Sequence, residues 1–181
     1  MASHIASLIM EAMNAECCQN FAGPKHTLVD FHRMMTRLVE MEDSQYSYRN
    51  VLAAYTSSGI LAGICVAYDG AKLHQLRRRF YEAALEAFGI DYTGMTDETE
   101  DGEFYIDSLA VSSNFRGKGI ASQLLQATIE RGAELGIPTV GLLVDKGNPK
   151  AEALYQRLGF VYVNDSTWGG HLMRHLQYKH D

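Results

Sequence analysis

The chain has 181 residues, of which 46% are hydrophobic and 21% are charged, both close to the average for soluble globular proteins. These values exclude the disordered and fibrous classes, and the length suits one domain spanning residues 1–181. A formal net charge of −6 argues against a general nucleic-acid binder, because such proteins usually carry a basic surface.

No stretch of about 18 uncharged apolar residues is present, and the start of the chain lacks the basic region and apolar core of a signal peptide. We therefore expect a cytoplasmic protein without a membrane partner. The three cysteines, Cys17, Cys18 and Cys65, match no zinc spacing, and the seven histidines show no metal-binding pattern. No metal site is predicted.

The first third of the chain combines helices with a hairpin. Apolar residues recur at helical spacing over residues 3–18, which predicts a first helix with Ser3 as its N-cap. Residues 31–41 predict a second amphipathic helix, whose methionine-rich face we interpret as core. Two β-rich runs at residues 50–57 and 60–68 then predict a hairpin.

The stretch from residue 69 to residue 102 holds a further helix and a long loop. Apolar residues from Leu73 to Phe88 trace a helical stripe, and we interpret Arg77-Arg78-Arg79 as a solvated basic face. Residues 89–102 are polar and contain several acidic side chains and turn formers, so we expect an exposed loop.

Strands and helices alternate in the second half of the chain. The expected elements are a strand at 103–111, a helix after a glycine turn, a strand at 139–144, a helix capped by Asn148, and strands at 160–163 and 172–178. Strand–helix–strand alternation implies parallel pairing, whereas hairpins imply antiparallel pairing. We therefore predict an α/β fold with a mixed sheet.

Residues 111–122 form the segment that indicates chemistry. A strand ends there, Gly117 and Gly119 permit a tight turn, and a helix starts at once. The first N–H groups of a helix have no intrahelical partner and carry partial positive charge, so a diphosphate fits there. Arg116 and Lys118 add positive charge. The pattern is neither the G-x-G-x-x-G fingerprint nor a P-loop, and it is also compatible with an ordinary helix entry.

The sequence of this segment resembles that of a known family. Arg116-x-x-Gly119-x-Ala121 is similar to the Arg/Gln-x-x-Gly-x-Gly/Ala signature of the GNAT superfamily of N-acetyltransferases, and it directly follows a strand ending in Leu109-Ala110-Val111. A second block looks like the family's cofactor-proximal helix: Asn148-Pro149-x-Ala151-x-x-Leu154-Tyr155-x-x-Leu158-Gly159-Phe160. The resemblance covers about residues 103–178 and is weaker before them.

The resemblance implies an acyl-CoA N-acyltransferase fold, in which helices flank a mixed central sheet that splays where the strand ending at Val111 parts from the strand after Pro138. A helix inserted between the family's third and fourth strands, within residues 69–102, is expected to shape the acceptor side. Acetyl-CoA is the implied co-substrate, with its pantetheine bonded by Asn148. The implied cofactor-binding residues are Leu109, Ala110, Val111, Arg116, Gly117, Lys118, Gly119, Ile120, Ala121, Ser122, Asn148 and Tyr155.

Two residues are candidates for catalysis. The resemblance implies that Tyr155 protonates the departing thiolate, with half-buried packing as the alternative. Direct attack on a thioester needs a neutral amine, whereas an alkylamine with a pKa of about 10 is protonated at neutral pH, so something must accept a proton. Asp107 lies where several family members carry an acidic residue proposed as base, and Glu103 and Tyr105 share its face of the strand. The roles of base, substrate anchor and structural residue stay open for Asp107.

The predicted function is transfer of an acetyl group to a primary amine by direct attack in a ternary complex. The alternative is a non-catalytic CoA-binding sensor or structural module of the same fold. A small-molecule or peptide amine is the expected acceptor, its identity and the acyl-chain preference stay open, and a homodimer is compatible with the sequence. The family usually opens with a strand, which is either absent here or lies outside this chain.

Overall fold

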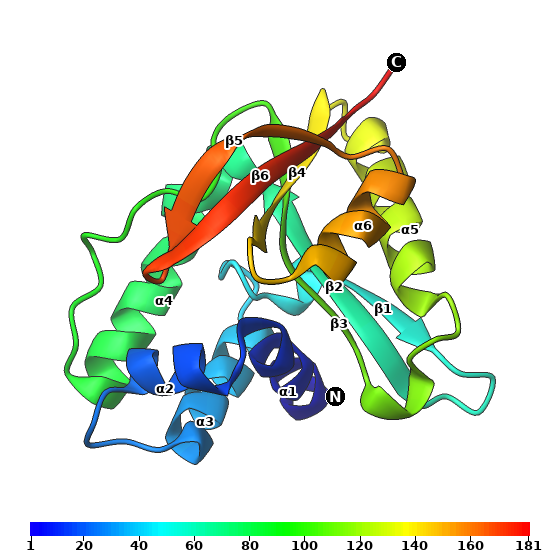
Figure 1. Cartoon of the computed structure of the whole chain (residues 1–181). Helices are drawn as coiled ribbons and strands as arrows, with labels where there is room; N and C mark the ends of the chain where they lie inside the picture. The colour runs from blue at the N-terminus through cyan, green and yellow to red at the C-terminus, as the bar shows by residue number, and fades with distance from the viewer.

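The computed structural model describes residues 1–181, and a six-stranded sheet in the order β1-β2-β3-β4-β6-β5 forms its centre (Figure 1). The strands are β1 (Val51–Tyr55), β2 (Leu61–Asp69), β3 (Glu103–Val111), β4 (Thr139–Asp145), β5 (Val161–Trp168) and β6 (His171–Lys179). β3 and β4 pair in parallel, and all other neighbours are antiparallel. The predicted mixed sheet is confirmed.

Helices cover both faces of this sheet, as Figure 1 shows. They are α1 (Ala2–Met13), α2 (Ala15–Ala22), α3 (Leu28–Glu40), α4 (Leu73–Phe88), α5 (Ile120–Glu134) and α6 (Pro149–Arg157). α4 lies between β2 and β3, which is where the inserted helix was expected. Not one of the helices is both long enough and apolar enough to cross a membrane.

Two buried clusters hold these layers together. The larger lies on the side of α1 to α4 and includes Phe31, Met34 and Met35, so the methionine-rich face of α3 belongs to the core as predicted. The other lies on the side of α5 and α6 and includes Leu125 and Leu142. Each fully buried side chain of this size contributes about 1.5–3 kcal/mol to folding. The sheet is thus fixed from both faces.

The two central strands part halfway along their length. β3 pairs with β4 only from Glu103 to Ile106, opposite residues 139–142 of β4. Residues 108–111 stay paired with β2 on one side, Asp107 lies at an irregularity of that pairing, and none of them has a paired strand on the other side. The predicted splay in the sheet is therefore present, and it exposes one main-chain edge of β3.

The prediction of one helix over residues 3–18 is wrong. The chain forms α1 and α2 instead, with a break at Asn14, whose φ is +71°. Asparagine adopts positive φ more readily than most residues, and its side chain accepts a hydrogen bond from the Cys17 N–H at 2.9 Å, which caps α2. Ser3 is not the N-cap of α1, which begins after Met1 without a side-chain cap.

The interpretation of Arg77-Arg78-Arg79 as a solvated face is wrong for its first member. The Arg77 side chain is only 1% exposed, whereas that of Arg78 is 64% exposed. Arg77 lies four residues after Leu73 and three before Phe80, so it occupies the buried stripe of α4. A helix that packs on the core therefore carries a buried cation.

The last two strands are longer than predicted. β5 runs to Trp168 and β6 begins at His171, so the pair continues through the polar residues 164–167. Gly169 and Gly170 join them with φ values of +57° and +79°. Positive φ at both positions is the geometry of a two-residue hairpin turn, which a glycine pair satisfies without strain. That pair is the signal for the longer hairpin.

Candidate functional site

A cavity of about 810 Å³ lies beside the half of β3 that β4 does not pair. Its α5 end is lined by Val111, Arg116, Gly117, Ala121, Asn148 and Ala151. Its opposite end, called the Asp107 end below, is lined by Met13, Tyr46, Glu98, Tyr105, Asp107, Trp168 and Met173. Leu109 lies on β3 between Asp107 and Val111, and Tyr155 lines the same cavity. The splay of the sheet thus creates one continuous site with two chemically different ends.

The turn before α5 presents a run of free main-chain donors. Gly117 and Gly119 have φ values of +74° and +79°, and Gly119 is the N-cap of α5 without a side-chain cap. No N–H group from Arg116 to Ser122 donates a hydrogen bond within the protein. An added Cβ at either glycine would meet nothing within 4 Å, so the glycines serve backbone conformation and not close packing. This geometry suits a bound anion.

The Arg116 side chain stabilises the turn itself. Its Nε donates to the Val111 carbonyl at 3.0 Å, and its Nη2 lies 3.4 Å from Glu11 of α1. The Lys118 ammonium lies 5.4 Å from the centre of the Phe115 ring. Arg116 therefore links α1, β3 and the turn, so part of its charge is already paired.

Main-chain groups of Leu109 and Val111 face the gap between β3 and β4. The Ser112 N–H donates to Ala62 of β2, so alternation along the strand directs the groups of residues 109 and 111 away from β2. The Val111 carbonyl is occupied by Arg116, which leaves its N–H and both main-chain groups of Leu109 available. The main-chain groups of Ala110 face β2.

α6 brings two predicted residues to the cavity. Asn148 caps α6 because its Oδ1 accepts from the Ala151 N–H at 3.2 Å, and its amide nitrogen makes no hydrogen bond within the protein. The Tyr155 ring packs edge-on against Phe160, and its hydroxyl has no protein partner. Burial raises the pKa of Tyr155 to about 12, so the phenol keeps its proton at neutral pH.

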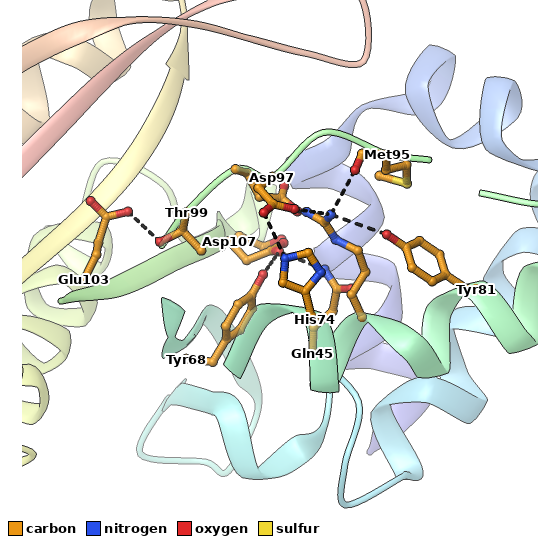
Figure 2. A network of polar contacts seen from close by, with 12 residues as sticks. Gln45, Tyr68, His74, Tyr81, Met95, Asp97, Thr99, Glu103 and Asp107 are labelled. Carbon is orange, nitrogen blue, oxygen red and sulfur yellow. Dashed lines mark hydrogen bonds and ion pairs between the residues drawn. The ribbon is translucent and has the colours of Figure 1, made fainter. Parts of the chain in front are cut away.

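Asp107 is the carboxylate at the opposite end of the cavity. Its Oδ2 accepts hydrogen bonds from Tyr68 at 2.9 Å (Figure 2) and from Gln45 at 3.3 Å. Its Oδ1 accepts a hydrogen bond from Ser108 at 2.9 Å. Burial raises the pKa of Asp107 above its ordinary value, and these donors oppose that shift only in part. A carboxylate with a raised pKa accepts a proton more readily than an exposed one.

Glu103 and Tyr105 share the face of β3 that carries Asp107, but they lie in different surroundings. The Glu103 carboxylate accepts from Thr99 at 2.7 Å and Gln177 at 2.7 Å, and it lies 2.6 Å from His175. It lines a second, smaller cavity, which shares Glu98 and Leu143 with the main one, and it does not line the main cavity itself. Tyr105 is buried and lines the Asp107 end. Asp107 is therefore the acid of this strand that faces the site.

Glu98 is a site residue that the sequence did not reveal. The loop after α4 was expected to be exposed, yet the Glu98 side chain is only 5% exposed and lines the main cavity. Its Oε1 accepts from the buried Arg77 guanidinium at 2.6 Å. Burial and the nearby Asp107 charge raise the pKa of Glu98 to about 7. The position of Arg77 on the apolar stripe was the one signal pointing to a buried acidic partner.

Comparison with known proteins identifies the family of the chain. The family described as "Acetyltransferase (GNAT) family" matches residues 34–160, which is more than half of the chain. The chain belongs to the GNAT acetyltransferase family. Its splayed sheet and the glycine turn before α5 are the features that the resemblance of residues 103–178 predicted.

Two curated acetyltransferases match shorter stretches of the chain. Mycothiol acetyltransferase of Propionibacterium freudenreichii is 36% identical over 78 residues, covering 42% of this chain and 24% of the relative. A probable spermine N(1)-acetyltransferase of Bacillus subtilis subsp. natto is 27% identical over 94 residues, covering 50% of this chain and 62% of the relative. The chain thus matches less than two thirds of the length of either relative.

A solved structure described as an acetyltransferase matches nearly the whole chain. Its TM-score is 0.78 at 27% identity, over 98% of this chain and 94% of the other. The likeness therefore extends over α1 to α4 as well as over the GNAT signature region.

Proposed function

We propose that this chain is an N-acetyltransferase that moves an acetyl group from acetyl-CoA to a primary amine in a ternary complex. The observation that carries the proposal is the single cavity with free main-chain donors at its α5 end and a buried carboxylate at the other. Tyr155 lines the same cavity with an unpaired hydroxyl. Acetyl-CoA, which is polyanionic, and a cationic amine would thus meet beside Tyr155, which can donate a proton.

The α5 end supplies the groups that would hold acetyl-CoA. The free N–H groups from Arg116 to Ser122 would bind the diphosphate, since helix N-termini favour anions. The Leu109 main-chain groups and the Val111 N–H would pair with the pantetheine arm along the exposed edge of β3. The free amide nitrogen of Asn148 would donate to the same arm. These contacts would position the thioester beside the exposed edge of β3.

Asp107 would accept the proton that makes the amine nucleophilic. An ammonium has no lone pair, and its pKa falls when it leaves water for a low-dielectric cavity. The same burial raises the pKa of the Asp107 carboxyl, so both shifts favour proton transfer from substrate to Asp107. A water molecule between the two groups would serve the same purpose.

Tyr155 would supply a proton to the leaving group. Acetyl-CoA supplies the acetyl group as a thioester, so a carbon–nitrogen bond forms as the carbon–sulfur bond breaks. The Tyr155 phenol would protonate the departing thiolate, and its raised pKa keeps it a donor throughout the neutral range. Positioning of the amine and thioester contributes the larger share of the rate.

A thiol-release assay with acetyl-CoA and a panel of primary amines tests this proposal. Tyr155→Phe and Asp107→Asn are each expected to lower turnover by at least about tenfold while CoA binding, measured by calorimetry, is retained. Tyr48→Phe and Asp101→Asn are matched controls, because both residues are exposed and lie outside the cavity.

The acyl donor and the catalytic role each have an alternative outcome in the same assay. CoA binding without turnover of any amine would favour the non-catalytic CoA-binding module instead. Turnover only with longer acyl-CoA donors would correct the acyl group while leaving the catalytic proposal in place.

A further inference from the structure

The segment between β2 and β3 contributes its own carboxylate to the cavity. Glu98 comes from the loop that follows α4, and its Oε1 accepts from Arg77 at 2.6 Å. The other oxygen, Oε2, makes no hydrogen bond within the protein, and it is not an enclosed atom. Glu98 lines the main cavity together with Asp107, and it also lines the smaller cavity beside Glu103, so its carboxylate lies next to both.

Arg77 holds Glu98 in place without facing the cavity. The guanidinium is buried, and its Nη1 lies 3.4 Å from Asp97, 3.4 Å from the Tyr81 hydroxyl and 3.5 Å from the Met95 carbonyl. Figure 2 shows Asp97, Met95 and Tyr81 converging on this point. Arg77 is absent from the cavity lining. Its charge therefore supports Glu98 from behind and is not free to pair with a ligand.

The Asp107 end is consequently electronegative toward whatever enters it. Two carboxylates, Glu98 and Asp107, line this end. The only lysine and arginine side chains in the lining, Arg116 and Lys150, belong to the α5 end. His171 and Asp145, which lie 3.4 Å apart, also line the cavity, as does Glu11. No lysine or arginine is available there to pair with a carboxylate of the acceptor.

The remaining lining at this end is aromatic or apolar. Tyr46 and Tyr105 are buried, and Met13, Trp168 and Met173 complete the wall. The Trp168 indole N–H is buried without a partner in the protein. Such a wall suits an apolar or aromatic body beside the ammonium group.

We propose that Glu98 and Asp107 together bind the ammonium of the acceptor, and that the acceptor is a primary amine with an apolar body and no carboxylate. This inference rests on the proposed function and specifies its substrate class. The α-carboxylate of an amino acid would lie near two carboxylates, at an end of the cavity that no lysine or arginine side chain lines. Like charges brought together in a desolvated site oppose binding strongly.

Three compounds of similar size separate charge from shape. Phenethylamine lacks a carboxylate, phenylalanine carries one, and phenylalaninamide replaces it with a neutral group of nearly the same volume. We expect kcat/KM for phenylalaninamide and phenethylamine to exceed that for phenylalanine by about 100-fold or more. Values for phenylalanine and its amide within threefold of each other would overturn the inference.

A substitution at Glu98 tests the residue itself. Glu98→Gln is expected to raise KM for the amine at least tenfold with little change in kcat, and to narrow the preference for the amide over the acid. Glu100→Gln, an exposed residue of the same loop, is the matched control and should leave both values unchanged. An unchanged KM in a folded Glu98→Gln protein would overturn the role of Glu98.

Calorimetry separates this inference from the proposed function. Titrating the three compounds into the wild-type protein in the presence of CoA measures acceptor binding without turnover. Preferential binding of the amine and the amide without any acetylation would refute the enzymatic proposal and support the charge selection. Equal binding of acid and amide, with acetylation intact, would overturn the inference alone. This comparison uses only the wild-type protein, so it tests the inference even if Glu98→Gln does not fold.

Discussion

Replacing Arg77 with methionine is expected to destabilise the protein strongly. The Arg77 and Glu98 side chains are 1% and 5% exposed, and their charged atoms lie 2.6 Å apart. Methionine fills much of the same volume but leaves Glu98 without its counter-charge. Removing one partner of a buried pair costs about 3–5 kcal/mol. For a chain of this length, each kcal/mol lowers Tm by about 2–4 °C, so we expect a fall of about 10 °C.

The pH dependence of that loss follows from Glu98. The pKa of Glu98 is already about 7, and removal of the guanidinium raises it further. A carboxyl whose folded pKa is raised stabilises the folded state fully below its unfolded pKa, and that contribution disappears as pH rises through the folded pKa. The Arg77→Met protein should therefore lose about 1 kcal/mol less at pH 5 than at pH 8.

Urea denaturation at both pH values measures these differences. Arg78→Met, on the exposed face of the same helix, should cost no more than about 0.5 kcal/mol. Glu98→Gln added to Arg77→Met should recover at least half of the loss, because it removes the unpaired charge. An Arg77→Met protein within 1 kcal/mol of wild type at pH 8 would refute the reasoning about the buried pair.

Three further measurements test the site. Gly119→Ala should weaken CoA binding at least tenfold in calorimetry, because alanine disfavours the φ of +79° that the turn requires. Gly59→Ala, at a hairpin glycine with φ of +80°, should leave binding unchanged. The kcat/KM of the wild-type protein should fall as pH is lowered, with an apparent pKa above that of an ordinary aspartate, because burial raises the pKa of Asp107. If the residual activity of Asp107→Asn falls at the same low pH, Asp107 is not the group that causes this decrease. Tyr155→Phe should lower kcat by about 10- to 100-fold in the thiol-release assay with less than a threefold change in CoA affinity, whereas a matched loss of affinity would indicate a packing role.

The region from β3 to α6 could be predicted because its signals are local. The alternation of residues 103–111 predicts a strand, and Gly117 and Gly119 supply the positive φ values that the following turn requires. Asn148 caps α6 as expected, through a contact only three residues long. Motifs of this kind fix the backbone within a few residues, so they can be recognised without knowledge of the tertiary structure.

The Asp107 end could not be predicted in the same way. Glu98 belongs to a polar loop whose composition resembles any exposed loop, and only the packing of α4 brings it to Arg77. The separation of Glu103 from the cavity depends on His175 and Gln177 of β6, which lie more than 70 residues away in the chain. Acceptor recognition thus depends on contacts that join distant segments.

Calorimetry with two ligands tests most directly whether main-chain donors at the start of α5 bind the diphosphate of CoA. CoA should bind with one-to-one stoichiometry and at least 100-fold more tightly than pantetheine, which lacks the diphosphate. Equal affinity for the two compounds, or no heat with CoA, would contradict the account.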